Sequence, residues 1–467
     1  MKLKNKGGQM HIQKVVDFRK KIFSKMEREN NDRIWLRSSL KDIKRVVLIN
    51  SAPRCGSSML FSVLKKIPDI YSLHGETVPF YKLNGFSPDV SLSNQMSDEG
   101  VNFEGDNESL SRDVLSDLHV EGNDNSIIIN DIALDQYIDD LMLRFSIQWP
   151  TIDFDYDRFR RAATHVFDVS SQGGNEFEKE KFYLELIKLL RNDYNAINPY
   201  YYDIPYDMVK MTFPDVEVPE GPPNHSIMLE EPPFILLLPH RKVETADFTD
   251  KILLLKTSVD CYRMNFIERM FPHADIKVIY LTRNPLASIN GLYDGWIHRG
   301  FFSHNLAGFF ESNRSNTKGL KIKGYSDIYE WGKWWWNYDL TPGWYNYIER
   351  RLEEVCAFQW CTSNKTIQEY KHTSKIAHCH VTYEDMVLDF KSRLSTFEKI
   401  LDFIDVDTNI IQTLDLNELP VVQVTQPPRP YRWKERREIL VPLLDSPEVS
   451  EMYTQLGYNK KNIEEWL

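Results

Sequence analysis

The chain has 467 residues, of which 42% are hydrophobic and 13% aromatic, and it carries a formal net charge of −11. This length accommodates one large domain with an insertion, or two domains. Five scattered cysteines without paired spacing argue against a disulfide scaffold or a zinc site, and no apolar run approaches the roughly 18 residues of a membrane span.

The charge of the chain is unevenly distributed. Residues 86–245 contain 12 Lys and Arg against 31 Asp and Glu, a net of −19, whereas the remainder contains 45 against 37, a net of +8. A basic remainder suits an anionic ligand, and the acidic segment disfavours nucleic acid but tolerates a neutral or cationic small molecule. Since the first residues, MKLKNKGGQMHIQK, also lack the apolar stretch of a signal peptide, we expect a cytoplasmic protein that binds neither nucleic acid nor a membrane.

Residues 10–45 predict an amphipathic helix and a charged approach to the first strand. That strand opens the segment 45–66, RVVLINSAPRCGSSMLFSVLKK, in which the continuous apolar run Val46–Ile49 is typical of a parallel strand covered on both faces. Residues 50–58 are mostly small, so their backbone N–H groups can converge on an anion at the positive end of the next helix. We therefore predict a phosphate-binding loop here.

This loop departs from the Walker A pattern, G-x-x-x-x-G-K-[ST], at two defining positions. Ser51 replaces the first glycine and Ser57 replaces the lysine. Without that lysine the loop lacks the point charge that holds a β/γ phosphate pair, which disfavours an ordinary nucleotide triphosphatase or kinase. The cation that remains is Arg54, placed before the glycine.

A second short strand is predicted at Ile70–Leu73, and it leads into His74-Gly75-Glu76. The polar residues 84–126 are typical of a surface loop or of a partly disordered connection. Three helical patterns and two proline-rich stretches follow, at residues 138–149, 156–167, 176–194, 215–223 and 230–239. We expect residues 86–245 to form an acidic, mostly helical insertion that caps a substrate site, residues 45–85 and 246–467 to form the core, and residues 1–44 to form a helical extension.

Two more buried strands are predicted at Ile252–Leu255 and Ile276–Leu281, with a helix between them. Such a β-α-β unit has parallel strands. Arg283 follows the second strand directly, and Asn284-Pro285 opens the next helix. This order puts a guanidinium at the carboxyl edge of the sheet, where doubly wound folds bind ligands.

The residues after this helix are candidates for a substrate pocket. The polar and aromatic side chains in question are Trp296, His298, Arg299 and His304, followed by an aromatic run that ends at Trp344. Aromatic residues at this density are also typical of core packing, which is the more frequent arrangement for most of them.

Near the carboxyl end the chain combines a strand end with a basic cluster. Residues 381–386, VTYEDM, place Tyr383 after a predicted strand, and residues 429–436, RPYRWKER, concentrate four cations and two aromatics. A cluster of this kind can clamp a phosphate and stack on a purine.

Taken together, these motifs resemble the sulfotransferases that use 3′-phosphoadenosine 5′-phosphosulfate (PAPS) as donor. Pro53-Arg54-Cys55-Gly56-Ser57-Ser58 is similar to their 5′-phosphosulfate loop, and Arg283-Asn284-Pro285 to their 3′-phosphate motif. Residues 381–386 resemble the element whose tyrosine lies near the adenine, and residues 429–436 the basic loop that closes over the 3′-phosphate. The family usually has a serine eight residues after the arginine, whereas this chain has Gly291 there, with Ser288 and Asn290 as possible substitutes.

The resemblance covers residues 45–76 and 251–458 and implies an α/β fold of P-loop type, with three αβα layers, a central parallel sheet and a large, mostly helical insertion. It implies PAPS as co-substrate and 3′-phosphoadenosine 5′-phosphate (PAP) as product. The donor-binding residues that it implies are Arg54, Cys55, Gly56, Ser57, Ser58, Met59, Arg283, Ser288, Tyr383, Arg429, Arg432, Trp433 and Lys434.

Sulfuryl transfer requires a base on the acceptor side and cations or N–H donors at the departing phosphate, and it demands no metal. We expect Arg54 and Lys256 to stabilise the leaving group, and Glu76 to be the base, with His74 as its rival. The predicted acceptor is a hydroxyl, less often an amine, of a small molecule or biosynthetic intermediate. Two alternatives stay open, a P-loop kinase that uses ATP and a non-catalytic nucleotide-binding protein.

Overall fold

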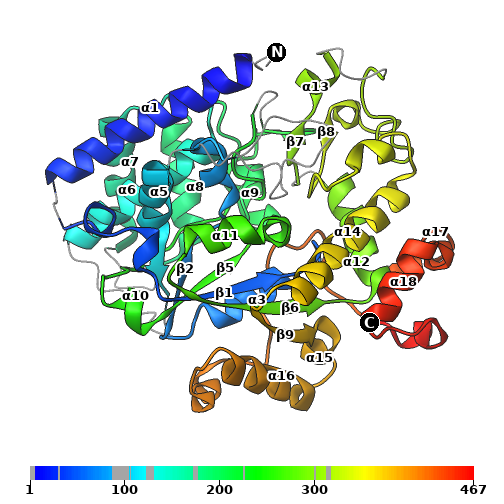
Figure 1. Ribbon diagram of the computed structural model, residues 1–467. Coiled ribbons are helices and arrows are strands. Elements are labelled where there is room, and N and C mark those ends of the chain that lie inside the picture. Colours follow the sequence, from blue (N-terminus) through cyan, green and yellow to red (C-terminus); the bar gives the residue numbers. More distant parts are fainter. Residues whose placement is uncertain are drawn as a thin grey trace.

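A central sheet of seven strands organises the fold, in the order β4-β3-β2-β5-β1-β6-β9 (Figure 1). The computed structural model describes residues 6–29, 32–86, 105, 107–121, 131–171, 177–223, 227–298, 301–311 and 317–467. The strands of the sheet are β1 (Arg45–Asn50), β2 (Ile70–Leu73), β3 (Leu118–Val120), β4 (Arg241–Lys242), β5 (Ile252–Lys256), β6 (Asp275–Thr282) and β9 (Ala377–Thr382); β7 (His304–Asn305) and β8 (Trp335–Trp336) form a separate pair.

The helices cover this sheet and build the regions beside it. Their bounds are α1 (Lys6–Glu29), α2 (Ile34–Arg37), α3 (Ser57–Leu64), α4 (Val78–Leu83), α5 (Asn107–Asp117), α6 (Asp131–Gln148), α7 (Tyr156–Ser171), α8 (Lys179–Leu190), α9 (Tyr206–Thr212), α10 (Asp247–Asp250), α11 (Met264–Met270), α12 (Pro285–Ile297), α13 (Ala307–Glu311), α14 (Leu352–Thr373), α15 (Tyr383–Val387), α16 (Phe390–Phe403), α17 (Arg437–Leu440) and α18 (Pro447–Gln455). None of the described helices combines the length and the apolarity needed to cross a bilayer.

Five strands, β2, β5, β1, β6 and β9, run parallel, which confirms the predicted α/β class. The strands β5 and β6, predicted as one β-α-β unit, are parallel but not neighbours, because β1 lies between them. From β1 the chain passes to β2 on one side of it and later to β6 on the other. Such a reversal of strand order opens a crevice at the carboxyl ends of the strands.

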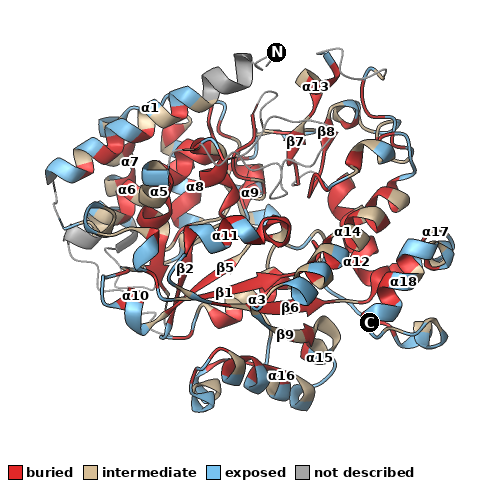
Figure 2. Ribbon diagram, viewed as in Figure 1, coloured by how far each residue is buried: buried red, intermediate tan, exposed pale blue. Residues whose placement is uncertain are grey.

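Successive side chains of β1 point to opposite faces of the sheet and pack with different helices. Val47 and Ile49 pack with α3, α15 and α16, whereas Val46 and Leu48 pack with α4, α5 and α11. Alternation of this kind follows from the two-residue period of a strand. Both faces of the sheet are therefore covered, and Figure 2 shows the strands buried among helices whose outer faces are exposed.

The segment predicted as an insertion is mostly helical and also contributes to the sheet. Its helices α6, α7 and α8 share a hydrophobic cluster with α1. Its two short strands extend the sheet in antiparallel fashion, since β3 pairs with β2 and β4 pairs with β3. The acidic segment is thus joined to the core through backbone hydrogen bonds as well as side chains.

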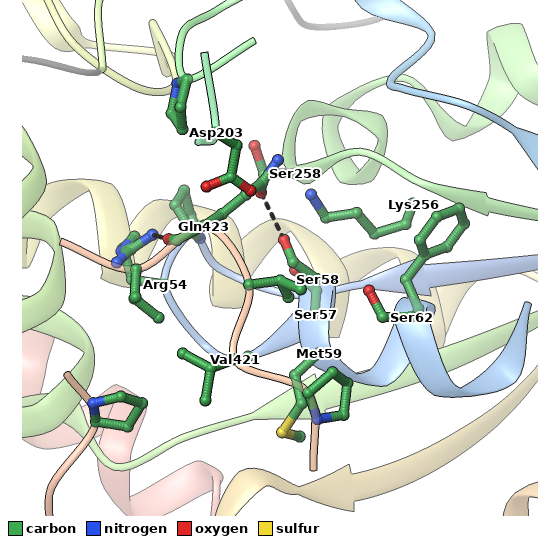
Figure 3. Close-up of a pocket in the computed structure, with 18 of the residues that line it drawn as sticks. Arg54, Ser57, Ser58, Met59, Ser62, Asp203, Lys256, Ser258, Val421 and Gln423 are labelled. Atoms are coloured by element: carbon green, nitrogen blue, oxygen red, sulfur yellow. Dashed lines mark hydrogen bonds between the residues drawn. The ribbon is translucent and has the colours of Figure 1, made fainter. Parts of the chain in front are cut away.

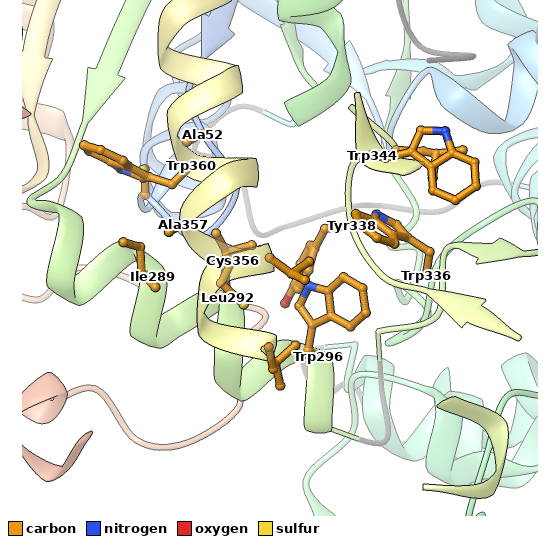
Figure 4. Close-up of a cluster of buried hydrophobic side chains, with 14 of the residues drawn as sticks. Ala52, Ile289, Leu292, Trp296, Trp336, Tyr338, Trp344, Cys356, Ala357 and Trp360 are labelled. Carbon is orange, nitrogen blue, oxygen red and sulfur yellow. The ribbon is translucent and has the colours of Figure 1, made fainter. Parts of the chain in front are cut away.

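The tryptophan-rich region forms a core of its own beside the sheet (Figure 4). Trp296 on α12, Trp360 on α14, Trp336 and Trp344 are all fully buried. The indole of Trp296 lies edge-on to Trp336 with 5.1 Å between the ring centroids, and its N–H donates to Gln359. Such packing holds α12 against α14. The helix α12 begins two residues after Arg283.

Candidate active site

A cavity of about 730 Å³ lies beyond the carboxyl ends of the parallel strands. Each of these strands ends in a segment that lines it: the loop 53–59 after β1, His74-Gly75-Glu76 after β2, Lys256 at the end of β5, Arg283 after β6 and Tyr383 after β9. A wall made of residues 419–433 completes the cavity, and Figure 3 shows part of this wall, with Val421 and Gln423, facing Ser57 and Ser58.

The loop after β1 has a backbone that only particular residues adopt. Gly56 has a φ of +95°, and a Cβ added to it would lie 2.4 Å from Cδ2 of Tyr383. Arg54 also has a positive φ, of 67°, which is unusual for a residue with a side chain. Gly56 caps the N-terminus of α3, so this turn presents the amino end of the helix to the cavity.

Arg54 and Arg283, two of the arginines that line the cavity, lack a carboxylate partner among the described residues. Nη1 of Arg54 donates to the carbonyl of Gln423 at 2.8 Å, and Nη1 of Arg283 donates to the carbonyl of Arg54 at 3.3 Å. The Nε atom of each is buried without an acceptor. Arg283 also lies over the ring of Tyr383, 4.2 Å from its centroid. Half-buried guanidiniums with unused donors favour an anionic ligand.

Gln423 accepts hydrogen bonds from two side chains of the loop that could also donate to an anion. Its backbone carbonyl accepts from Arg54, and its side-chain oxygen accepts from Oγ of Ser58 at 2.8 Å (Figure 3). Two oxygen acceptors thus already face the loop where the sequence predicts a phosphate. Nothing in the spacing of the motifs indicated this contact, because Gln423 is 365 residues from Ser58.

The basic cluster near the carboxyl end divides into two groups. Arg432 and Arg436 both pair with the buried Asp294, at 2.8 and 2.7 Å. Burial lowers the pKa of Arg432, opposed by Asp294 and reinforced by the nearby cations Arg283, Arg54 and Arg436. Arg54, Arg283, Arg432 and Arg436 thus lie near one another, and among the described residues only Arg432 and Arg436 pair with a carboxylate, that of Asp294. Arg54, Arg283 and Arg432 line the cavity.

The other members of that cluster have partners elsewhere. Arg429 borders the cavity and pairs with Glu435, and Lys434 pairs with Glu464 at 3.0 Å. Trp433 also borders the cavity, but it is buried, and its indole N–H donates to the carbonyl of Trp466 at 2.9 Å. This position makes Trp433 part of the core as well as of the cavity wall.

The structure gives a reason for the glycine where the resembled family has a serine. A Cβ at Gly291 would lie 3.0 Å from Cβ of Arg54, so glycine leaves room for the arginine. Ser288 is buried, and its hydroxyl lies 3.4 Å from Sγ of Cys55. Burial raises the pKa of this thiol to about 11, so Cys55 is neutral at physiological pH. Asn290 borders the cavity and accepts a hydrogen bond from Arg436.

Glu76 and Lys256 form an ion pair inside the cavity, with Nζ 2.6 Å from Oε1. They come from the segments that end the neighbouring strands β2 and β5. The side chain of Glu76 remains 39% exposed, whereas that of Lys256 is mostly covered. Glu76 can therefore still reach a ligand while Lys256 holds its orientation.

Three further carboxyl groups lie in the electrostatic surroundings of Glu76. Burial, with a smaller contribution from the charge of Glu76, raises the pKa of Glu231, Asp260 and Asp339 to about 7 in each case. Oγ of Ser258 donates to Asp339 at 2.8 Å and opposes the shift there. Ser258 and Glu231 both line the cavity.

Replacing Asp339 by asparagine should flatten the pH dependence of stability. A carboxyl group whose pKa rises to about 7 on folding contributes stability below its ordinary pKa of 3.8, and this contribution is lost as the pH rises through 7. The full shift corresponds to at most about 4 kcal/mol. Urea unfolding of both proteins at pH 5 and pH 8 measures this contribution. If the free energy of unfolding changed by the same amount between the two pH values in both proteins, the assignment would be wrong.

The segment that carries Glu76 rests on an ion-pair network from the acidic insertion. The guanidinium of the buried Arg144 joins Asp117 and Glu230, each at 2.5 Å. A Cβ at Gly75 would lie 2.8 Å from Nη1 of Arg144, so the glycine allows this close approach. The insertion therefore packs against Gly75, the residue before Glu76. It also contributes Glu230, Glu231 and Pro232 to the cavity lining.

The remaining predicted site residues occupy several places. Met59 lines the cavity with Ser57 and Ser58, and His74 borders it while stacking on His119. Trp296 and His304 are buried away from the lining, and burial lowers the pKa of His304 to about 3. His298 is exposed and not part of the lining, and Arg299 lies outside the described residues.

Several lining residues carried no signal in the sequence. Phe301 lies under Arg54, 5.1 Å from the guanidinium carbon to the ring centroid. The hydroxyl of Tyr338 is buried and has no hydrogen-bond partner among the residues that the structure describes. These side chains reach the cavity from the region of β7 and β8, far along the chain from the loop.

Neither a protein-family model nor a curated protein matches this sequence. Among solved structures, the chain is similar to a sulfotransferase domain from the curacin biosynthetic pathway, with 11% identity, a TM-score of 0.34, and coverage of 89% of this chain and 99% of that one. It is also similar to a sulfotransferase domain from the Synechococcus PCC 7002 olefin synthase, with 14% identity, a TM-score of 0.33, and coverage of 90% and 96%. At this degree of similarity neither structure transfers a function to the chain, which has to be inferred from the cavity itself.

Proposed function

We propose that the protein transfers a sulfuryl group from PAPS to a hydroxyl group of a small molecule. The observation that carries this proposal is the pair Arg54 and Arg283, two guanidiniums without carboxylate partners among the described residues that meet at a glycine turn and a helix N-terminus. An anionic donor with phosphates at both ends of a ribose suits such a site. Arg54, Ser57 and Ser58 would hold the 5′-phosphosulfate end, and Arg283 and Arg432 the 3′-phosphate.

The reaction uses the two sides of the cavity differently. The acceptor oxygen attacks sulfur and forms a new S–O bond, while the bond from sulfur to the 5′-phosphate oxygen breaks and its electron pair leaves with PAP. Glu76 takes the proton of the acceptor hydroxyl. Arg54 and the loop amides offset the negative charge that grows on the departing phosphate. Lys256, expected from the sequence to stabilise the leaving group, is instead assigned to position Glu76 through their ion pair.

The walls beyond Glu76 favour a partly apolar acceptor without a strong negative charge. Val78, Pro79, Pro232, Ile235 and Leu236 line this side, together with Glu230 and Glu231. A hydroxyl carried on an apolar group would bury that group here and reach Glu76. The acidic side chains disfavour an anionic acceptor, and an amine acceptor is the less favoured variant.

Calorimetry separates this function from its alternatives. We expect the protein to bind PAP without magnesium, and to bind ATP weakly with or without it, because Ser57 replaces the lysine that a β/γ phosphate pair requires. Binding of ATP alone would favour the kinase alternative. Tight PAP binding without PAPS turnover over a panel of hydroxylated acceptors would favour the non-catalytic one.

A further inference from the structure

Three histidines form a row at the antiparallel edge of the sheet. His74 follows β2 directly, His119 lies within β3, and His240 directly precedes β4. The register pairs His119 with Ser72 on one side and with Lys242 on the other. His74 and His240 are each two residues from these paired positions, so all three side chains stand on one face as diagonal neighbours. Their ligand-capable nitrogens all lie within 4.8 Å of one another.

The central histidine is buried, and its ring nitrogens are poorly satisfied by the part of the chain that the structure describes. His119 is 1% exposed, and among the described residues neither of its ring nitrogens makes a hydrogen bond of good geometry, although the backbone of Asp117 lies near the ring. Buried polar groups in folded proteins are nearly always satisfied, so an imidazole with both nitrogens unused indicates an absent partner. Its ring stacks on His74 with 3.8 Å between centroids and on His240 with 4.7 Å.

Several charged side chains of both signs surround the row. The nearby cations are paired: Lys65 with Glu121 and Lys242 with Asp140, each at 2.6 Å, and Arg144 with Asp117 and Glu230.

We propose that His74, His119 and His240 form a binding site for a divalent transition-metal ion of the zinc class. Three neutral nitrogen donors suit Zn²⁺, Co²⁺, Ni²⁺ or Cu²⁺, whereas Mg²⁺ and Ca²⁺ prefer oxygen ligands. The rings lie stacked in this structure, and the bond from Cβ to the ring has a broad rotational preference, so each ring can turn its nitrogen toward a shared ion. His74 borders the cavity, which gives the ion a path of entry.

The metal would have a positioning role. It would tie β3 and the start of β4 to the end of β2, two residues before Glu76. It would contribute no step to the sulfuryl transfer, which needs only the cations and the base already described. The site therefore stands independently of the proposed function.

The test measures metal content and affinity on the full chain. After treatment with a chelator and dialysis against micromolar ZnCl2, we expect one zinc per wild-type chain by elemental mass spectrometry. His119→Gln should weaken binding by about 100-fold or more, since even partners one shell beyond a metal ligand change affinity by about 10-fold to 100-fold. Co²⁺ should give the visible absorption of a site with nitrogen ligands in the wild type and not in the variant.

His165→Gln is the matched control, because His165 is exposed on α7, away from the row. It should bind zinc as the wild type does, and circular dichroism establishes that both variants are folded. Absence of zinc from the wild type, or equal zinc binding in His119→Gln, would overturn the site. Calorimetry of the metal-free wild type with PAP tests the donor site separately, so failure of one proposal leaves the other measurable.

Discussion

Replacing Arg283 by alanine should weaken the binding of PAP by about 100-fold or more. A hydrogen bond to a charged group contributes about 1.5–3 kcal/mol, and an arginine usually makes two such bonds to a phosphate. A loss of about 3 kcal/mol corresponds to roughly two decades of affinity. Arg283 makes no ion pair with a carboxylate of the described part of the chain, so the substitution leaves no buried acid unpaired. Calorimetry with PAP measures the loss.

Two companion variants make this result specific. Arg429→Ala removes an arginine from the cavity rim that already pairs with Glu435, and it should weaken PAP binding far less than Arg283→Ala. Arg283→Lys keeps the charge but loses the forked donor geometry, so it should recover only part of the affinity. If Arg283→Ala bound PAP as the wild type does, the 3′-phosphate would have to lie elsewhere, and the assignment of the donor site would be wrong.

Replacing Glu76 by glutamine should lower the turnover of PAPS by about 100-fold to 10,000-fold, the usual contribution of a general base. Glutamine has nearly the same shape and can still accept a hydrogen bond from Lys256, so the local structure is preserved while the proton acceptor is lost. The measurement is the initial rate of PAP formation at saturating PAPS with an acceptor that the wild type uses.

His74→Gln distinguishes the two candidate bases. The ring of His74 stacks on His119, whereas Lys256 forms its ion pair with Glu76. We therefore expect a much smaller loss of turnover in this variant. Calorimetry with PAP should show that Glu76→Gln retains donor binding, since Glu76 faces the acceptor side. Full turnover in Glu76→Gln together with a large loss in His74→Gln would reverse the roles.

Much of the donor side was predictable from the sequence because its signals are local. An apolar run, a turn of small residues and an amphipathic helix, all within residues 45–66, predict the strand, the loop and α3 in order. Arg283 was placed at the sheet edge by the same reasoning, since it directly follows an apolar run. In parallel strands the carboxyl ends meet at one edge, so these two segments had to converge.

The sequence alone also determined the class of fold and the absence of the P-loop lysine, because both depend on residue types at fixed spacing. The contacts of the site did not follow from spacing. Three of these contacts join segments that lie up to several hundred residues apart in the sequence. Gly291 makes room for Arg54, Asp294 pairs with Arg432 and Arg436, and Gln423 accepts a hydrogen bond from Ser58.

Only the tertiary structure decided how each side chain is used, because burial and pairing belong to the folded chain. Trp433 looked like a purine-stacking residue and also packs in the core, where it donates to Trp466. In the sequence His74 is a candidate base, but in the structure it lies in a row with His119 and His240. The positions of these two residues in the sequence did not indicate that they would meet His74. Strand register, which brings together residues on β2, β3 and β4, is set by the packing of the whole sheet and not by any one segment.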